Sequence, residues 1–153
     1  MLPPSPPPDR DTLQNQSALL MLSSLLQHPG VLSAFVTDDA GHLITAAGES
    51  MPPSAGVLVL AHATLSAASE FGRRSGSGDC IELVQHHEGG LVLLRGLPHR
   101  HALIVRCEAG VNMDSVRRQA ATFQLSATGS TQPHRASAPA LNLGDALHAM
   151  PAW

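Results

Sequence analysis

The chain has 153 residues, of which 43% are hydrophobic, enough for one globular core and too few for two. Its nine basic and twelve acidic residues give a formal net charge of −3, and the basic residues are not clustered, which argues against a nucleic-acid partner or an anionic membrane surface. Lysine is absent, so Schiff-base and lysine general-base chemistry are excluded.

Residues 1–10 are rich in proline and predict an extended leader that is neither helix nor strand. A first helix is expected to begin at a cap formed by Asp11 or Thr12. It should end by Gln27, because a proline and a glycine follow at positions 29 and 30. The residues expected on its buried face are Ala18, Leu19, Leu22, Leu25 and Leu26.

Two short strands, residues 31–37 and 42–47, are predicted to form a hairpin around a turn at residues 38–41. A second helix is expected over residues 55–71, with Gly72 as its stop. Three strands follow at residues 80–85, 91–95 and 102–107, separated by turn-like segments at 86–90 and 96–100. Connections this short require antiparallel neighbours.

A third helix is predicted to begin after a cap at Asn112 and to end near Ala127. One face of this helix is apolar and is expected to be buried. It holds Met113, Val116, Ala120, Phe123 and Ala127.

The second predicted helix has more apolar surface than a core requires. Its apolar arc spans roughly 220°, about twice what a surface helix needs. A fully buried central helix would show the same pattern, but a domain of this size has little material to cover a helix on all sides. The excess therefore favours a self-association or partner surface, and Ala63 and Ala67 would let a neighbouring helix approach closely.

The sequence offers little that could carry catalysis. Its nine histidines form no HExxH pattern, the glycine-rich residues 72–79 lack a P-loop lysine, and no serine lies in a GxSxG elbow. Cys80 and Cys107 are expected to be buried free thiols in a reducing cytoplasm. We therefore expect a protein that is not an enzyme and that needs no metal and no cofactor.

The expected organisation is a leader at residues 1–10, one domain at residues 11–127 and a flexible Ser/Thr/Pro/Ala-rich tail at residues 128–153. No segment looks like a signal peptide. The longest strongly apolar run, residues 57–61, is far shorter than the roughly 20 residues that span a bilayer. A cytoplasmic protein without membrane insertion is the expectation.

The tail contains a short apolar peptide. Leu143, Leu147 and Met150 share one helical stripe, and Trp153 follows them. Such a peptide could dock on a partner or on the domain itself. A disordered tail with incidental apolar residues is the alternative.

In its order of elements, from about Leu19 to Leu125, the chain resembles the roadblock/dynein light chain family, which includes the MglB-type regulators of bacterial polarity. The resemblance implies an α+β fold with a five-stranded antiparallel sheet, two helices on one face and the second helix on the other. The residues that carry it are Leu22, Leu25, Pro29 to Val31, Ala34 to Val36, the turn at 38–41 with Leu43 and Ile44, the apolar second helix, Leu91 to Leu94, Leu103 to Val105, and Val116 with Arg117.

The resemblance also implies a homodimer. Family members typically pair their third strands across a twofold axis while their second helices pack together, which protects an edge strand. Carried over to this chain, the implied dimer or partner interface comprises Val57, Leu60, Ala61, Ala63, Thr64, Ala67, Phe71, Cys80, Ile81, Glu82, Leu83 and Val84.

A small Ras-like GTPase is the partner that the resemblance implies. Family members commonly scaffold or regulate such GTPases, and the MglB type stimulates GTP hydrolysis by repositioning the switch loops of the GTPase. Leu60, Thr64 and Ala67 are the implied contacts here. As a hypothesis, the tail residues Leu143, Leu147, Met150 and Trp153 add a second contact.

Two other classes of protein stay open. A profilin-like or PAS-like module would hold a small ligand, although the only aromatic residues, Phe35, Phe71, Phe123 and Trp153, are few for lining a pocket. A purely structural dimerisation adaptor would bind a GTPase without changing its hydrolysis rate.

Overall fold

The computed structural model describes residues 2–7, 9–48 and 53–123. Five strands form one antiparallel sheet in the order β2-β1-β5-β4-β3. The predicted order of elements and the antiparallel sheet are confirmed. The elements are α1 (Arg10–Leu26), β1 (Val31–Thr37), β2 (Leu43–Gly48), α2 (Ala55–Arg74), β3 (Glu82–His87), β4 (Gly90–Gly96), the short 3-10 helix η1 (Pro98–Arg100), β5 (Ala102–Cys107) and α3 (Met113–Ala121).

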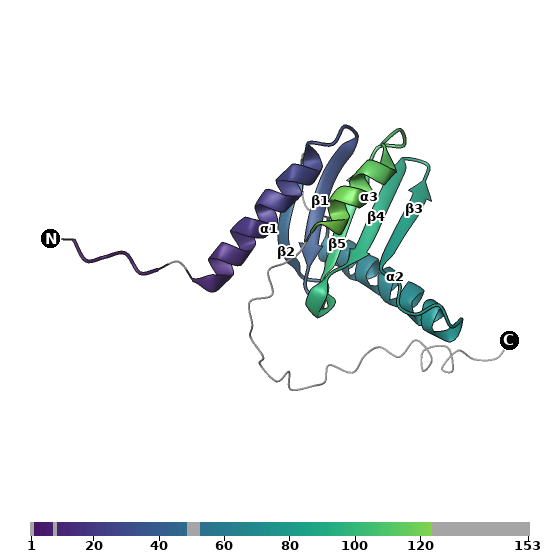
Figure 1. Ribbon diagram of the computed structural model, residues 1–153, viewed down its shortest axis with the longest axis horizontal. Helices are drawn as coiled ribbons and strands as arrows, with labels where there is room; N and C mark the ends of the chain where they lie inside the picture. The colour runs from purple at the N-terminus through teal and green to yellow at the C-terminus, as the bar shows by residue number, and fades with distance from the viewer. Residues whose placement is uncertain (1, 8, 49–52, 124–153) are drawn as a thin grey trace.

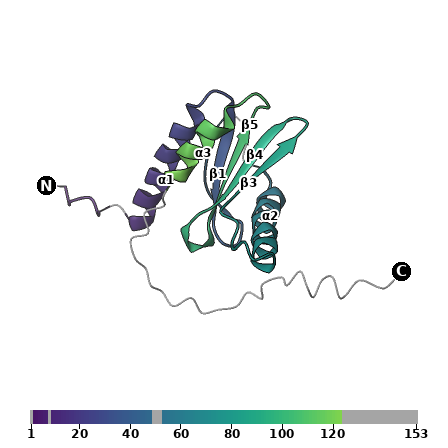
Figure 2. The same ribbon diagram turned by 45° about the vertical axis from the view of Figure 1, so that its right-hand side comes forward.

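The helices form two unequal layers on the sheet. Helices α1 and α3 lie on one face and α2 lies on the other, as Figures 1 and 2 show. The larger core lies under α1 and α3, and it includes the fully buried Leu22, Leu93, Leu103 and Val116. Under α2 there is a smaller cluster, to which this helix contributes only two buried residues, Leu58 and Leu65. The predicted α+β architecture, with α2 alone on its face, is confirmed.

Helix α1 begins earlier than the sequence suggests. The amides of Thr12 and Leu13 donate to the Asp9 carbonyl at 2.9 and 3.3 Å, so the helix starts at Arg10, directly after the proline-rich segment. The predicted cap at Asp11 or Thr12 is therefore wrong. On its predicted buried face Leu19 is an exception, because it lies at the margin of the arc that the sheet and α3 cover and is 44% exposed.

The prediction that Gly72 ends α2 is wrong, because the helix continues to Arg74. A Cβ atom at position 72 would lie 2.1 Å from the carbonyl oxygen of Gly78. The amides of Ser77 and Gly78 donate to the Gly72 carbonyl at 2.8 and 3.1 Å, which folds the following loop back onto the helix. The glycine is required for this close approach and not for ending the helix.

Strand β3 begins and ends two residues later than predicted. The Cys80 amide donates to the Ser69 hydroxyl at 3.1 Å, which ties Cys80 to α2 before the strand begins at Glu82. His86 and His87, predicted to lie in a turn, pair with Leu91 and Gly90 in the β3–β4 ladder. The turn is therefore shorter than predicted.

Helix α3 is capped as predicted, since the Asn112 side chain accepts a hydrogen bond from the Ser115 amide at 3.2 Å. The helix ends at Ala121 and not near Ala127. The Thr122 hydroxyl donates to the Gln119 carbonyl at 2.7 Å, and the Phe123 amide donates to the Ala120 carbonyl at 3.0 Å, which tightens the last turn.

The remaining strand predictions are accurate to within one residue at each end. In the leader, residues 2–7 and 9 are exposed and form neither helix nor strand. The tail at 128–153, with Leu143, Leu147, Met150 and Trp153, lies outside the described residues.

Candidate functional site

One side of α2 holds this helix on the sheet. The residues on that side recur at intervals of four and three, and they are Leu58, His62, Leu65, Ser69 and Gly72. Leu58 and Leu65 belong to the small core under the helix. The His62 Nε2 atom donates to the Arg100 carbonyl at 2.9 Å, which fastens the helix to the β4–β5 connection.

A second stripe runs along α2 with the same alternation of spacings and is largely exposed. We call it the α2 outer stripe, and it consists of Val57, Leu60, Thr64, Ala67 and Phe71. Leu60 is 67% exposed and Phe71 is 76% exposed. The Thr64 hydroxyl donates to the Leu60 carbonyl at 2.8 Å, so even its polar atom is used within the helix. The stripe is apolar, uncharged and open to solvent, which is the composition of an interface.

Charged residues are confined to the C-terminal end of α2. Glu70 accepts hydrogen bonds from Arg73 at 2.8 Å and from Arg74 at 2.7 Å. These two bonds, that from Arg73 first, lower the pKa of the Glu70 carboxyl below its usual value. Because Arg73 also pairs with Asp79, this end of the helix is a polar rim beside the uncharged stripe.

The sheet face on the α2 side changes in character along the strands. One row across the five strands is apolar and contains Leu83, Leu94, Ile104, Phe35 and Ala46. The next row is mixed and contains Gln85, Val92, Arg106, Ser33 and Gly48. Leu65 packs near Gly96, at the other end of β4, so α2 covers that end of this face. In the mixed row Arg106 is exposed and Gln85 and Val92 are half-buried, whereas Ser33 is fully buried.

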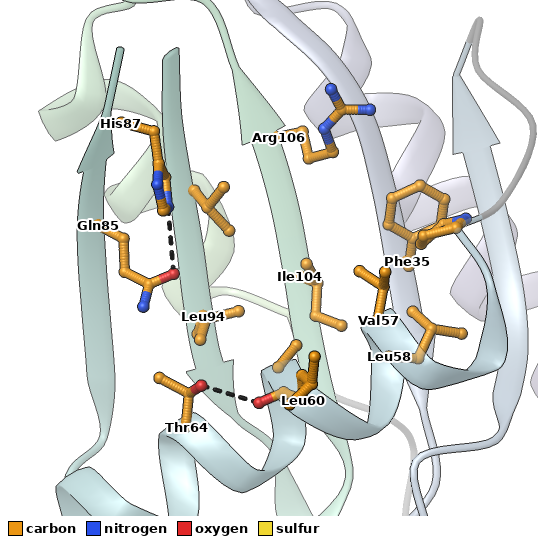
Figure 3. A pocket seen from close by; sticks show the side chains of 13 residues that line it. Phe35, Val57, Leu58, Leu60, Thr64, Gln85, His87, Leu94, Ile104 and Arg106 are labelled. Carbon is orange, nitrogen blue, oxygen red and sulfur yellow. Dashed lines mark hydrogen bonds between the residues drawn. The ribbon is translucent and has the colours of Figure 1, made fainter. Parts of the chain in front are cut away.

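A groove of about 420 Å³ lies between α2 and the uncovered part of the sheet. Figure 3 shows the α2 residues Val57, Leu60 and Thr64 along one side of the groove and Gln85, His87 and Arg106 toward the other. His87 Nε2 and Gln85 Oε1 lie 3.4 Å apart. Among the described residues, Arg106 has no acidic partner. The full lining is Phe35, Pro53, Val57, Leu58, Leu60, Ala61, Thr64, Gln85, His87, Val92, Leu94, Ile104 and Arg106.

Strand β3 forms one edge of the sheet and pairs only with β4 among the described strands. Ile81, just before the strand, is 67% exposed. Glu82 is directed toward the α3 layer, where its carboxylate accepts from Arg95 at 2.9 Å and from Arg117 of α3. These ion pairs fix the start of β3 and leave its outer edge available for pairing.

The sequence-predicted interface residues do not form one surface. Val57, Leu60, Thr64, Ala67 and Phe71 form the α2 outer stripe, and Ala61 lines the groove beside them. Ala63 is exposed, and it lies farther round the helix. Cys80 and Ile81 precede β3, Leu83 faces the groove side, and Glu82 and Val84 face the α3 side.

Sequence reasoning missed the groove residues that come from the central strands, notably Arg106, Val92 and Ile104. The signal that could have found them is the alternation within each strand, because a charged residue in an otherwise apolar strand must lie where water or a partner can reach it.

In the part of the chain that the structure describes, no group of three or more His, Cys, Asp or Glu residues is arranged to hold a metal ion. In the same part, α2 is the one helix long and apolar enough to cross a membrane, with a mean hydropathy of 1.2. The longest strongly apolar run in the sequence, residues 57–61, is too short to have predicted a helix of this kind. Core helices of soluble proteins also reach this length and hydropathy.

The two cysteines differ in their surroundings. Cys107 is buried in the larger core, and burial raises the pKa of its thiol to about 11, whereas Cys80 is half-buried beside α2. The Cys107 thiol should therefore be protonated at pH 8 and react little with iodoacetamide there. We expect mass spectrometry of the native protein to find Cys80 alkylated first. Equal labelling of Cys107 would contradict its burial, and urea-unfolded protein, in which both should react, is the control.

Comparison with known proteins places the fold. A scan against models of protein families finds no match, and a search of curated protein sequences finds none. Solved structures do match. A roadblock/LC7 domain from Streptomyces avermitilis is 18% identical with a TM-score of 0.62, and the match covers 67% of this chain and 88% of that one.

Two MglB structures are also similar. The gliding protein MglB from Thermus thermophilus is 15% identical with a TM-score of 0.64, over 71% of this chain and 83% of that one. MglB from Myxococcus xanthus is 14% identical with a TM-score of 0.62, over 76% of this chain and 86% of that one. At these identities the likeness shows the fold: the chain has the roadblock/LC7 fold in its MglB-like form.

Proposed function

We propose that the chain is a non-catalytic, homodimeric regulator or scaffold of a small Ras-like GTPase. The observation that carries the proposal is the α2 outer stripe, uncharged and exposed, beside the free edge of β3 in a roadblock fold. The GTPase itself comes from the family resemblance, since a fold does not by itself fix a function.

The arrangement of α2 and β3 supports a twofold dimer. In Figure 1 the C-terminal part of α2 extends beyond β3. If two β3 strands paired antiparallel about a twofold axis, each helix would reach over the sheet of the other copy, where the groove is open. Phe71 and Ile81, both exposed at this edge, would then be buried, and the unpaired edge of β3 would be satisfied.

The mechanism that fits this chain is an effect on the conformation of the GTPase. A protein without its own catalytic group can accelerate hydrolysis by stabilising switch loops in the hydrolysis-competent arrangement. The paired α2 helices would supply the contact surface, with Leu60, Thr64 and Ala67 as the proposed contacts.

The test uses purified Ras-like GTPases from the source organism, each loaded with GDP or with a non-hydrolysable GTP analogue. We expect the full chain to bind one of them in a nucleotide-dependent manner, in biolayer interferometry, and to change its single-turnover rate of GTP hydrolysis. Nucleotide-dependent binding with an unchanged rate would instead indicate the adaptor. Absence of binding to every GTPase would overturn the proposal.

The groove favours a second candidate, a module that binds a small ligand. Its volume of about 420 Å³ lies within the range of ligand pockets. Arg106, on its rim, would bind the carboxylate of an otherwise apolar molecule. A rise in melting temperature with such a carboxylate, lost in Arg106→Gln and kept in Arg118→Gln, would support this candidate against the GTPase regulator.

A further inference from the structure

Strand β2 is an edge of the sheet that the proposed dimer does not cover. Among the described strands it pairs only with β1, and β3 forms the opposite edge. β2 contains no charged residue and no proline, which are common means of blocking an edge. The one irregularity in its ladder with β1 lies at the hairpin end, beside Thr37. The backbone N–H and C=O groups on the outer side of β2 are therefore available to a further strand.

The side of α1 that lies above this edge is partly apolar and uncovered. Ser24 of α1 accepts a hydrogen bond from Gln119 of α3 at 3.1 Å, so α3 lies on that side of the helix. At the opposite margin of the buried row that contains Ala18 is a set of exposed or half-buried residues, which we call the α1 edge flank: Thr12, Asn15, Leu19 and Leu26. Because Figure 1 shows α1 and β2 at the side of the molecule opposite β3, this flank faces outward past β2.

One segment of the tail has the sequence pattern of a strand. Residues 141–149 lie between two prolines and contain none. Alternate residues of an extended chain share a side, and one side would hold four apolar residues and one acid: Leu141, Leu143, Asp145, Leu147 and Ala149. The other side would hold only small or polar residues: Asn142, Gly144, Ala146 and His148. A helix would place Leu141 about 160° away from Leu143, so only an extended segment gathers all three leucines.

We propose that residues 141–149 add a strand to the outer edge of β2, with their leucine side beneath the α1 edge flank. The backbone groups of the two strands would pair, and the leucines of the segment would cover those of the flank. Asp145 would face the polar part of the flank, where Thr12 and Asn15 have side chains that can donate hydrogen bonds. This pairing does not depend on the proposed dimer, which uses the other edge of the sheet.

The linker is long enough for the segment to reach β2 of its own chain. Phe123, the last described residue, is buried in the core under α1 and α3, so the linker starts on the face where α1 lies. It must pass α1, whose diameter with side chains is about 10–12 Å. Residues 124–140 could span roughly 55 Å when extended. Such a tether keeps the segment near the edge at an effective concentration in the millimolar range, an advantage that a second copy or a foreign strand lacks.

Amide hydrogen exchange, measured by NMR on the full chain, tests the inference, because strand pairing protects backbone amides. We expect alternate amides of residues 141–149 to exchange at least about tenfold more slowly than in a free peptide of the same sequence. Leu143→Asp, which puts a charge on the leucine side, should remove this protection, whereas Asn142→Asp, on the other side, should keep it. Likewise Leu19→Asp should remove it, and Leu20→Asp, outside the α1 edge flank, should not.

Wild type without protection in residues 141–149 would overturn the inference, as would protection that Leu143→Asp leaves unchanged. Protection lost in Met150→Asp but kept in Leu141→Asp would indicate a docked helix and overturn the added strand. Protection that disappears on tenfold dilution would overturn pairing within one chain and indicate a second copy.

The result is separable from the proposed function. Leu60→Asp, which should break the proposed dimer, should leave the protection of the tail unchanged, so failure of either proposal can be recognised without the other. The tail variants alter no residue of the domain, so their results decide the matter even if Leu19→Asp does not fold.

Discussion

Replacing Leu60 with aspartate should halve the mass of the assembly. Leu60 is 67% exposed in the single chain, so the substitution should leave the domain folded. In the proposed dimer it would bury a carboxylate against the apolar surface of a second copy. A cost of about 3 kcal/mol or more weakens association at least ~100-fold. Light scattering coupled to size exclusion measures the mass, and circular dichroism checks the fold.

The matched control for Leu60→Asp is Ser66→Asp. Ser66 is an exposed residue of the same helix, more than a quarter-turn away from the α2 outer stripe. The Ser66→Asp variant should keep the assembly mass of the wild type. If Leu60→Asp also kept it, the α2 outer stripe would not be the dimer surface. If both variants lost mass equally, the effect would be one of charge on α2 and not of the stripe.

Substituting Gly72 by alanine should destabilise the domain by about 2 kcal/mol, although alanine is the better helix former by roughly 1 kcal/mol. The reason is steric, because the new Cβ would meet the Gly78 carbonyl oxygen at 2.1 Å and force the loop off the helix. Urea unfolding at one fixed protein concentration measures the free energy of unfolding, since association would otherwise contribute.

Replacing Gly56 by alanine should not lower the free energy of unfolding, in contrast to the same replacement at Gly72. Gly56 lies in the first turn of α2, and of the residues that the structure describes only Ser54, with its hydroxyl at 4.0 Å, is near the position of a new Cβ. This variant should be neutral or stabilising by about 0.5 kcal/mol. A stabilised Gly72→Ala would show that the loop yields easily, and that the glycine is not required for the close approach.

Periodicity along the chain was sufficient to predict the elements and their order, whereas the arrangement of the helices in two layers was implied by the family resemblance. The buried face of α1 with Leu22 and Leu25, the strands β1 and β5, and the Asn112 cap all depend on residues close in sequence. The excess apolar surface of α2 was also predictable, because the number of buried positions that one sheet face can offer a helix is limited. In the structure this helix indeed has only Leu58 and Leu65 buried.

Features that depend on how a loop folds back on its helix, or on how one element lies over another, were not predictable. Gly72 has the sequence signature of a helix stop, and only the position of Gly78 shows its actual role. Cys80 and Ile81 have the composition of strand residues, but Ser69 holds Cys80 at the helix. The alternation within β5 could mark Arg106 as accessible, but assigning it to the groove requires knowing how far α2 extends over the sheet, which no local pattern records.

The strand order divides the sheet into two pieces that differ in how they can fold. β1 and β2 form one hairpin, β3, β4 and β5 form a meander, and each piece is built from neighbours in sequence. Only the pairing of β1 with β5 joins them, and its outermost pair, Val31 with Cys107, closes a loop of roughly 75 residues. The large core under α1 and α3 spans this junction, so it can form only after that loop has closed. Closure of the β1–β5 ladder is therefore the step on which the folding rate of this domain should depend most.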